Sequence, residues 1–167
     1  MSRQKGFSLM ELLVVVAIML IIAAIAIPNL LRSRMAANEA SAVGSLRTIN
    51  TAEVTYASIY PNYGFTDLNY LGATATPAGP LGAGLLDLTL GCPAGVTGGV
   101  CPKSGYTFKI TVAINGGVSP MTSTYSVQAY PLTQGSTGMR SFFTDASGEI
   151  RYRTDATSAT VIDSALL

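Results

Sequence analysis

The sequence has 167 residues, of which 49% are hydrophobic and only 11% are charged. Soluble domains carry roughly 25% charged residues, so the proportion here is less than half the usual one. This composition excludes an intrinsically disordered chain and argues against an ordinary cytosolic enzyme. The net charge is +1, which provides no long-range attraction to nucleic acid. The sequence contains no histidine, so acid–base catalysis or metal binding through an imidazole is excluded.

A long apolar segment follows a short basic head. Arg3 and Lys5 precede it, and residues 12–31 contain no charged side chain over 20 positions. A helix of about 20 residues crosses the hydrocarbon core of a bilayer, and the segment exceeds the roughly 7–15 apolar residues of a cleaved secretory signal. We therefore expect residues 7–31 to form the membrane-spanning half of a long helix, with a kink near Pro28.

The residues before this segment form a motif. They read Gly6-Phe7-Ser8-Leu9-Met10-Glu11. A basic leader that ends in glycine, followed by Phe, Ser, Leu, any residue and Glu before an apolar run, resembles the N-terminus of type IV prepilins and of type II secretion pseudopilins. The resemblance covers about residues 1–60. On physical grounds alone, Glu11 is interpreted as a carboxylate at the membrane edge whose side chain reaches water.

The resemblance implies a processing site and an assembly site. A prepilin peptidase would remove the leader, residues 1–6, by cutting between Gly6 and Phe7, and would methylate the new amine of Phe7. Glu11 would then be the fifth residue of the mature chain and would pair with the ammonium group of a neighbouring subunit inside a filament. A carboxylate buried in hydrocarbon is costly without an opposite charge, so this pair would set the axial register. Phe7, Glu11 and Pro28 are the predicted assembly residues.

Residues 32–60 are predicted to continue the helix as an amphipathic half that ends at Tyr60-Pro61. Apolar residues recur at steps of three and four. They are Val43, Leu46, Ile49, Ala52, Tyr56 and Ile59. We expect this stripe to pack on a head domain. Gly44 interrupts the pattern and is interpreted as tolerated, at a cost of about 1 kcal/mol.

Residues 61–105 are predicted to be a loop region, because glycine and proline make up a third of residues 61–102. The region contains the only two cysteines of the sequence, Cys92 and Cys101. In an exported domain they lie in an oxidising compartment, which favours a structural disulfide. A zinc site would need two further ligands, and a redox motif would need a spacing of two residues. The pair lies upstream of the place where many pilins have a disulfide loop.

Residues 106–153 are predicted to form an antiparallel sheet of three or four strands. The predicted strands cover residues 106–114, 124–129, 139–144 and 149–153, with a turn at Asn115-Gly116-Gly117. A sheet of this size needs a cover on its apolar face, which the helix stripe supplies. The expected fold class is therefore α+β, a long N-terminal helix packed on the sheet, with residues 154–167 as a C-terminal tail.

No motif for catalysis is present, so we do not expect an enzyme, a cofactor or a metal site. A small basic cluster, Arg140, Arg151 and Arg153, could contact DNA, a surface or a neighbouring subunit. We favour a solvated strand face next to acidic residues, and leave nucleic-acid binding open.

The resemblance implies a structural subunit, a major pilin, of a type IV pilus-like filament. Its partners would be further copies of itself in a helical homopolymer, the prepilin peptidase and the pilus assembly machinery. It would be a single-pass precursor in the bacterial inner membrane and then part of an extracellular filament. Two alternatives remain: a pseudopilin of a type II secretion system, and an uncleaved binding protein held by a signal anchor.

Overall fold

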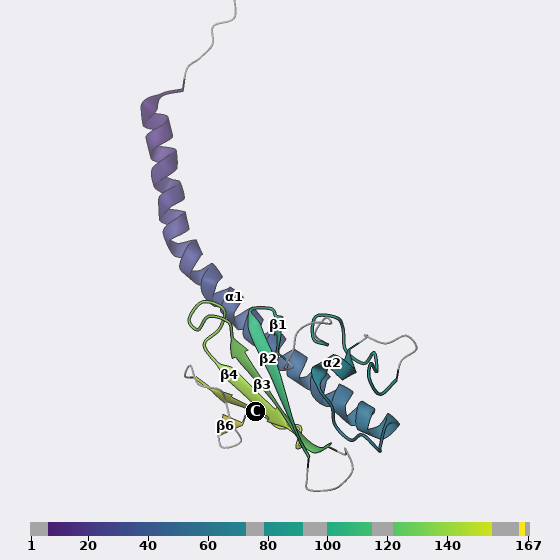
Figure 1. The fold of residues 1–167 in the computed structure, drawn as a ribbon. Coiled ribbons are helices and arrows are strands. Elements are labelled where there is room, and N and C mark those ends of the chain that lie inside the picture. The colour runs from purple at the N-terminus through teal and green to yellow at the C-terminus, as the bar shows by residue number, and fades with distance from the viewer. Residues whose placement is uncertain (1–6, 73–78, 92–99, 115–121, 155–163, 166–167) are drawn as a thin grey trace, which may run out of the picture. The chain divides into compact units, whose positions relative to one another are not determined.

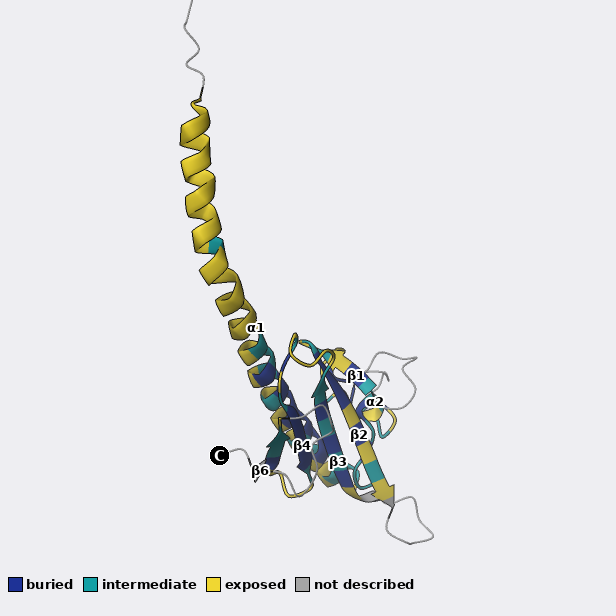
Figure 2. Ribbon diagram, turned by 90° about the vertical axis from the view of Figure 1, so that its left-hand side faces the viewer, coloured by how far each residue is buried: buried dark blue, intermediate teal, exposed yellow. Residues whose placement is uncertain are grey.

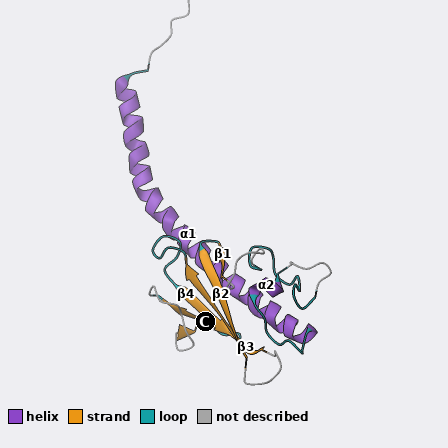
Figure 3. Ribbon diagram, viewed as in Figure 1, coloured by secondary structure: helices purple, strands orange, loops and turns teal. Residues whose placement is uncertain are grey.

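The computed structural model describes residues 7–72, 79–91, 100–114, 122–154 and 164–165 (Figure 1). Residues 1–34 and 35–167 form two separate compact units. Helix α1 (Leu9–Ile59) begins in the first unit and ends in the second (Figure 3). Its length confirms the predicted long N-terminal helix.

The first unit is the apolar part of α1. Its leucine, alanine and methionine residues favour helix, and its valines and isoleucines cost little in an apolar setting. Pro28 lies inside α1, and the helix continues through it. The predicted kink at this proline stays a prediction.

The second unit contains an antiparallel sheet whose strands follow one another in chain order. The strands are β1 (Val100–Lys103), β2 (Tyr106–Ile114), β3 (Thr122–Pro131), β4 (Ser141–Asp145), β5 (Ile150–Arg153) and β6 (Ser164–Ala165). The α+β class is confirmed, but the predicted count of three or four strands is too low, since β1 and the two-residue β6 extend the two edges. The turn at residues 115–117 lies outside the described residues, as does most of the tail.

Strand β1 lies at the end of the predicted loop region, residues 61–105, where no strand was expected. It pairs with β2 so that Cys101 faces Phe108 and Lys103 faces Tyr106. The connection is a two-residue turn, in which Ser104 has φ 50° and Gly105 has φ 74°. Positive φ at both central positions is the type I′ geometry that matches the twist of a hairpin. The proline of this strand, Pro102, is tolerated because β1 is an edge strand.

The second half of α1 packs on one face of the sheet (Figures 1 and 2). The predicted stripe is confirmed at Leu46, Ile49, Ala52 and Tyr56, which are all buried. It is wrong at Ile59, the last residue of α1, which is 54% exposed. The facing core residues come from β2 to β5 and from the short helix α2 (Leu68–Leu71). They are Tyr106, Phe108, Ile110, Tyr125, Val127, Ala129, Phe142, Ile150, Leu68 and Leu71.

Polar contacts at the start of the second unit join α1 to the loop between β3 and β4. The Glu39 carboxylate accepts hydrogen bonds from the backbone N–H of Met139 at 2.8 Å and from Nε of Arg140 at 2.8 Å. The Asn38 amide donates to the carbonyl of Thr137 at 2.9 Å. Charge-assisted bonds of this kind fix position as well as adding energy, so this loop is held against the helix.

Two glycines give a matched test of this packing. A Cβ on Gly138 would lie 2.1 Å from the Tyr106 hydroxyl, which is held in place because it donates to the Arg140 carbonyl at 2.7 Å. We expect Gly138→Ala to lower the free energy of unfolding by about 1–3 kcal/mol or more through overpacking. A Cβ on Gly44, inside α1, meets nothing within 4 Å. Gly44→Ala should therefore add about 0.5–1 kcal/mol. Urea unfolding of both variants checks the opposite signs, and equal effects would contradict the packing described here.

Candidate processing and assembly site

The first turn of α1 contains the predicted processing and assembly residues. Phe7 and Ser8 precede the helix, and the Leu12 N–H donates to the Ser8 carbonyl at 3.2 Å. The Glu11 carboxylate reaches back and accepts a hydrogen bond from the Ser8 backbone N–H at 3.4 Å. Serine before a helix with glutamate three residues later is the capping-box pattern, of which this bond is one half. Glu11 therefore has a local partner, which the sequence interpretation missed although the S-x-x-E spacing signals it.

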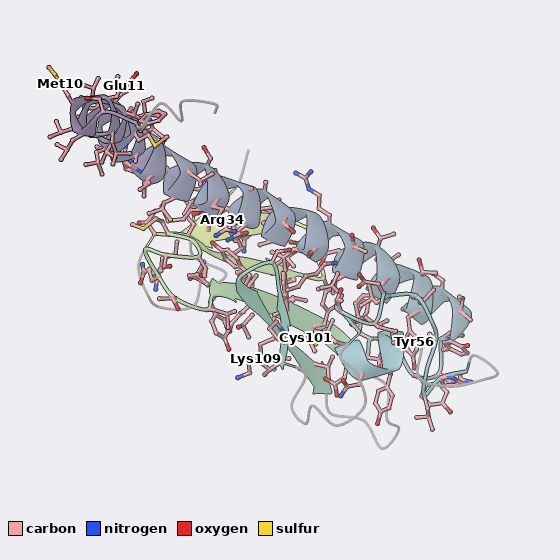
Figure 4. The ribbon with its side chains drawn as sticks, turned by 90° about the horizontal axis from the view of Figure 1, so that it is seen from above. Met10, Glu11, Arg34, Tyr56, Cys101 and Lys109 are labelled. Carbon is pink, nitrogen blue, oxygen red and sulfur yellow. The ribbon has the colours of Figure 1, made fainter. Side chains whose placement is uncertain are left out.

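The side chains around this turn are exposed. Phe7 is 80% exposed, and the Met10 and Glu11 side chains project from the start of the helix (Figure 4). Glu11 lies in the first turn, where the unsatisfied N–H groups of a helix favour a negative charge. An amine on Phe7 would stand four residues before Glu11 on the same chain. Gly6 lies outside the described residues, so the cleavage position stays a prediction.

The surface that follows Glu11 is apolar on all sides. An 18-residue window in α1 has a mean hydropathy of 3.0 and at most two charged residues, and none of the window is buried. By length and composition alone, α1 can cross a membrane. Exposed apolar surface on this scale marks a membrane or protein contact. Pro28 lies within this stretch, and its predicted role in assembly stays a prediction.

The remaining predicted residues lie in the second unit. Cys101 is buried in β1 and is not a free thiol. Its predicted partner, Cys92, lies outside the described residues, so the Cys92–Cys101 disulfide stays a prediction. Within the described ranges, no group of three or more His, Cys, Asp or Glu residues could hold a metal ion.

The predicted basic cluster is divided among different contacts. The Arg140 guanidinium pairs with Glu39 and lies 5.6 Å from the Phe142 ring centroid. The Arg151 guanidinium contacts the carboxylates of Glu149 and Asp145. Both side chains therefore have partners within the chain: Arg151 pairs with acidic residues next to it, whereas the partner of Arg140 lies on α1.

Comparison with known proteins identifies the N-terminal segment. Residues 1–27 match the model of the prokaryotic N-terminal methylation motif. The chain carries a prepilin-type N-terminus. The motif includes Gly6, Phe7 and Glu11, and it extends through most of the exposed apolar helix.

Two relatives are similar to part of this chain. The type IV major pilin protein PilA of Myxococcus xanthus is 39% identical over 61 residues, which are 36% of this chain and 28% of the relative. The type IV wide pilus major component PilA4 of Thermus thermophilus is 56% identical over 39 residues, 23% of this chain and 30% of the relative. The chain thus spans less than a third of the length of either relative. No solved structure matches.

Proposed function

We propose that this chain is the structural subunit, a major pilin, of a type IV pilus-like filament. The observation that carries the proposal is a prepilin-type methylation motif that extends into a helix whose apolar residues are exposed. The two relatives, which are named as major pilus components, support the same function. The folded second unit would form the part of the subunit that faces outward from the helix core.

The exposed apolar surface suggests two successive environments. Before assembly, lipid would cover the side chains of residues 12–31 and anchor the precursor in the inner membrane. After assembly, the helices of neighbouring subunits would replace the lipid. Exchange of one apolar environment for another costs little in transfer free energy, so packing and polar contacts would decide whether the filament forms. Glu11 is the acidic group at the start of this surface.

Processing by a prepilin peptidase would create the amine with which Glu11 pairs. Removal of residues 1–6 places a new amino terminus on Phe7, one residue before Ser8. An ammonium and a carboxylate that leave water together offset part of each other's desolvation cost. Motility, adhesion or DNA uptake would then be properties of the polymer and of its assembly machinery.

Substitution of Gly6 tests the processing step. We expect Gly6→Val to block cleavage, because the added side chain would occupy the space next to the scissile bond that glycine leaves open. The wild-type chain should yield a mature peptide that begins at Phe7 and carries one methyl group, and the variant should retain Met1. Mass spectrometry of the N-terminal peptide distinguishes them. A mature-sized product from Gly6→Val would contradict the predicted cut, and an uncleaved functional wild type would favour the signal-anchored binding protein.

Electron microscopy of surface filaments, with mass spectrometry of their subunits, tests the structural role. The proposal expects this chain as the main component of long extracellular fibres. Its absence from such fibres, together with normal processing, would reject the major pilin and favour a pseudopilin of a secretion system. Gly44→Ala is a control substitution that should leave filaments intact, because the added Cβ meets nothing within 4 Å.

A further inference from the structure

A pocket lies in the second unit where the end of α1 meets α2 and the following loop. It has a volume of about 190 Å³, and four of its lining residues are aromatic: Tyr56, Tyr63, Phe65 and Tyr70. Tyr56 lies beside α2, and its hydroxyl donates to the Pro80 carbonyl at 2.7 Å (Figure 4). Aromatic rings therefore form much of the pocket wall, beside the aliphatic residues Pro80, Leu81 and Val112.

The rings are held in place before any ligand arrives. The Tyr56 and Tyr60 ring centroids are 5.0 Å apart, and the Tyr60 and Tyr63 rings meet edge to face at 6.5 Å. The Phe65 ring lies 4.7 Å from the Tyr125 ring of β3. A preformed site loses little conformational entropy on binding, which favours affinity for a small ligand.

The Asp67 carboxylate lines the same pocket and has no hydrogen-bond or ion-pair partner among the residues that the structure describes. Asp67 immediately precedes α2, yet its side chain makes no capping hydrogen bond. None of the ion pairs among the described residues includes it. Burial raises the pKa of Asp67 above its ordinary value, and no hydrogen bond or positive charge opposes the rise. An incoming cation would offset this cost of desolvation.

A second acidic residue, Glu53, contacts the pocket lining, but burial raises its pKa to about 8, so it is protonated at neutral pH and adds no charge. Glu53 is completely buried, and its carboxylate accepts a hydrogen bond from the N–H of Thr66 at 3.1 Å. Thr66 itself lines the pocket. Aromatic rings attract cations through their quadrupole, and the attraction is strongest where water is excluded. The aromatic rings and the Asp67 carboxylate together describe a site for an organic cation.

We propose that this pocket binds an organic cation, the ammonium or guanidinium head of a small solute or of a side chain from a neighbouring molecule. The inference concerns the second unit alone, so it does not depend on the proposed filament. A neutral ligand of the same shape would fill the pocket equally well but would leave Asp67 unpaired.

The test compares choline with 3,3-dimethylbutan-1-ol, a neutral molecule of the same shape. The full chain is purified in a maltoside detergent, which has no choline head group, and binding is followed by ligand-observed NMR of the methyl signal. We expect choline to bind at least about tenfold more tightly than the alcohol. Equal binding of the two probes would overturn the proposal, because it would show an apolar hollow only. Failure of choline to bind would overturn it as well.

Variants assign the binding to the pocket. Asp67→Asn should weaken choline binding about tenfold and leave the alcohol unaffected. Tyr70→Leu, at a ring that is 40% exposed, should weaken choline more than the alcohol. Glu149→Gln removes the same charge from an exposed turn and should change neither. If Glu149→Gln weakened choline as much as Asp67→Asn, general charge attraction rather than the pocket would account for the binding.

Assembled filaments distinguish the two sources of the cation. If the monomer binds choline and the filament does not, a side chain of the neighbouring subunit occupies the pocket. If both bind choline, the ligand is a solute. Either result, with the variant data, supports the cation chemistry, and failure to assemble leaves the monomer measurement intact.

Discussion

Glu53→Gln should be more stable than the wild-type chain at alkaline pH, by about 3–5 kcal/mol, and about equally stable below pH 5. Glu53 lies on α1 with none of its surface exposed. One carboxylate oxygen accepts the Thr66 N–H, and the other is buried without a hydrogen-bond partner. Burial raises the pKa of Glu53 from 4.5 to about 8; the Thr66 hydrogen bond lowers it and the charge of Asp67 raises it further.

The sign of the effect is determined by proton binding. Between about pH 4.5 and pH 8, the folded chain holds a proton on Glu53 that the unfolded chain has released. The free energy of unfolding therefore falls as pH rises through this window, by up to about 1.4 kcal/mol per pH unit, and levels off above it. Glutamine copies the protonated acid, since its oxygen can accept the Thr66 N–H and its NH₂ group replaces the other oxygen. It does not titrate, so this slope disappears.

Other titratable groups near Glu53 do not reproduce this behaviour. Burial raises the pKa of Tyr56, and burial followed by the charge of Glu53 raises the pKa of Tyr125 to about 12, so both stay neutral in the window. The pKa of Asp67 is also raised by burial, and its titration is common to both chains.

Unfolding by urea at about pH 5, 7 and 9, followed by tyrosine fluorescence of the full chain in detergent micelles, measures the difference. Glu149→Gln is the matched control, because its carboxylate is exposed and should change stability by less than about 1 kcal/mol at every pH. Parallel pH profiles for wild type and Glu53→Gln would show that Glu53 is ionised in the folded chain and would contradict this account.

Contiguous patterns in the sequence predicted the first unit and most of the helix packing. The prepilin-type motif and the uncharged run lie within one stretch of chain, so no long-range contact is needed to recognise them. Leu46, Ile49 and Tyr56 were placed correctly because helical periodicity determines which residues share a face. The strands β2 to β5 were predictable for the same reason, from alternation and turn residues.

Long-range polar contacts could not be predicted in this way. Glu39 and Glu53 were not among the predicted core residues, yet both are buried. Their positions carried a signal, since they continue the stripe of Leu46, Ile49 and Tyr56 at steps of three and four. Nothing in the sequence named their partners, because the Glu39 carboxylate binds Met139 and Arg140 about 100 positions away. On this helix, the position of a residue in the helical repeat predicts its burial better than the presence or absence of a charge on its side chain does.

The sequence analysis missed strand β1 and the aromatic pocket lined by Asp67 for a different reason. Both lie in the glycine- and proline-rich region, where composition predicts turns and hides short elements. Strand β1 has only four residues, and one of them is proline. The pocket depends on aromatic residues from α1, α2 and the loops between them, which only the fold brings together.

Glu11→Gln should reduce filament yield about a hundredfold or more and leave membrane insertion unchanged. In the proposed filament, Glu11 pairs with the ammonium group of a neighbouring Phe7. Removing one member of a buried ion pair costs about 3–5 kcal/mol, because the other charge stays buried without a partner. Insertion should not change, since the apolar residues after Glu11 remain and glutamine adds no charge. Filaments sheared from cells and counted by mass spectrometry, beside the membrane fraction, give the two quantities.

Glutamine separates the two contacts that Glu11 can make. Its side-chain oxygen can still accept the Ser8 N–H, the bond that the structure places at 3.4 Å, so the start of α1 should persist. Ser8→Ala is the complementary control, because it keeps both the backbone N–H and the carboxylate and should assemble normally. A normal yield from Glu11→Gln would confine Glu11 to its local role at the helix start. If Glu11→Gln lowers the filament yield and Ser8→Ala assembles normally, assembly requires the negative charge of Glu11. Pairing with the amine of a neighbouring subunit is the contact that uses this charge.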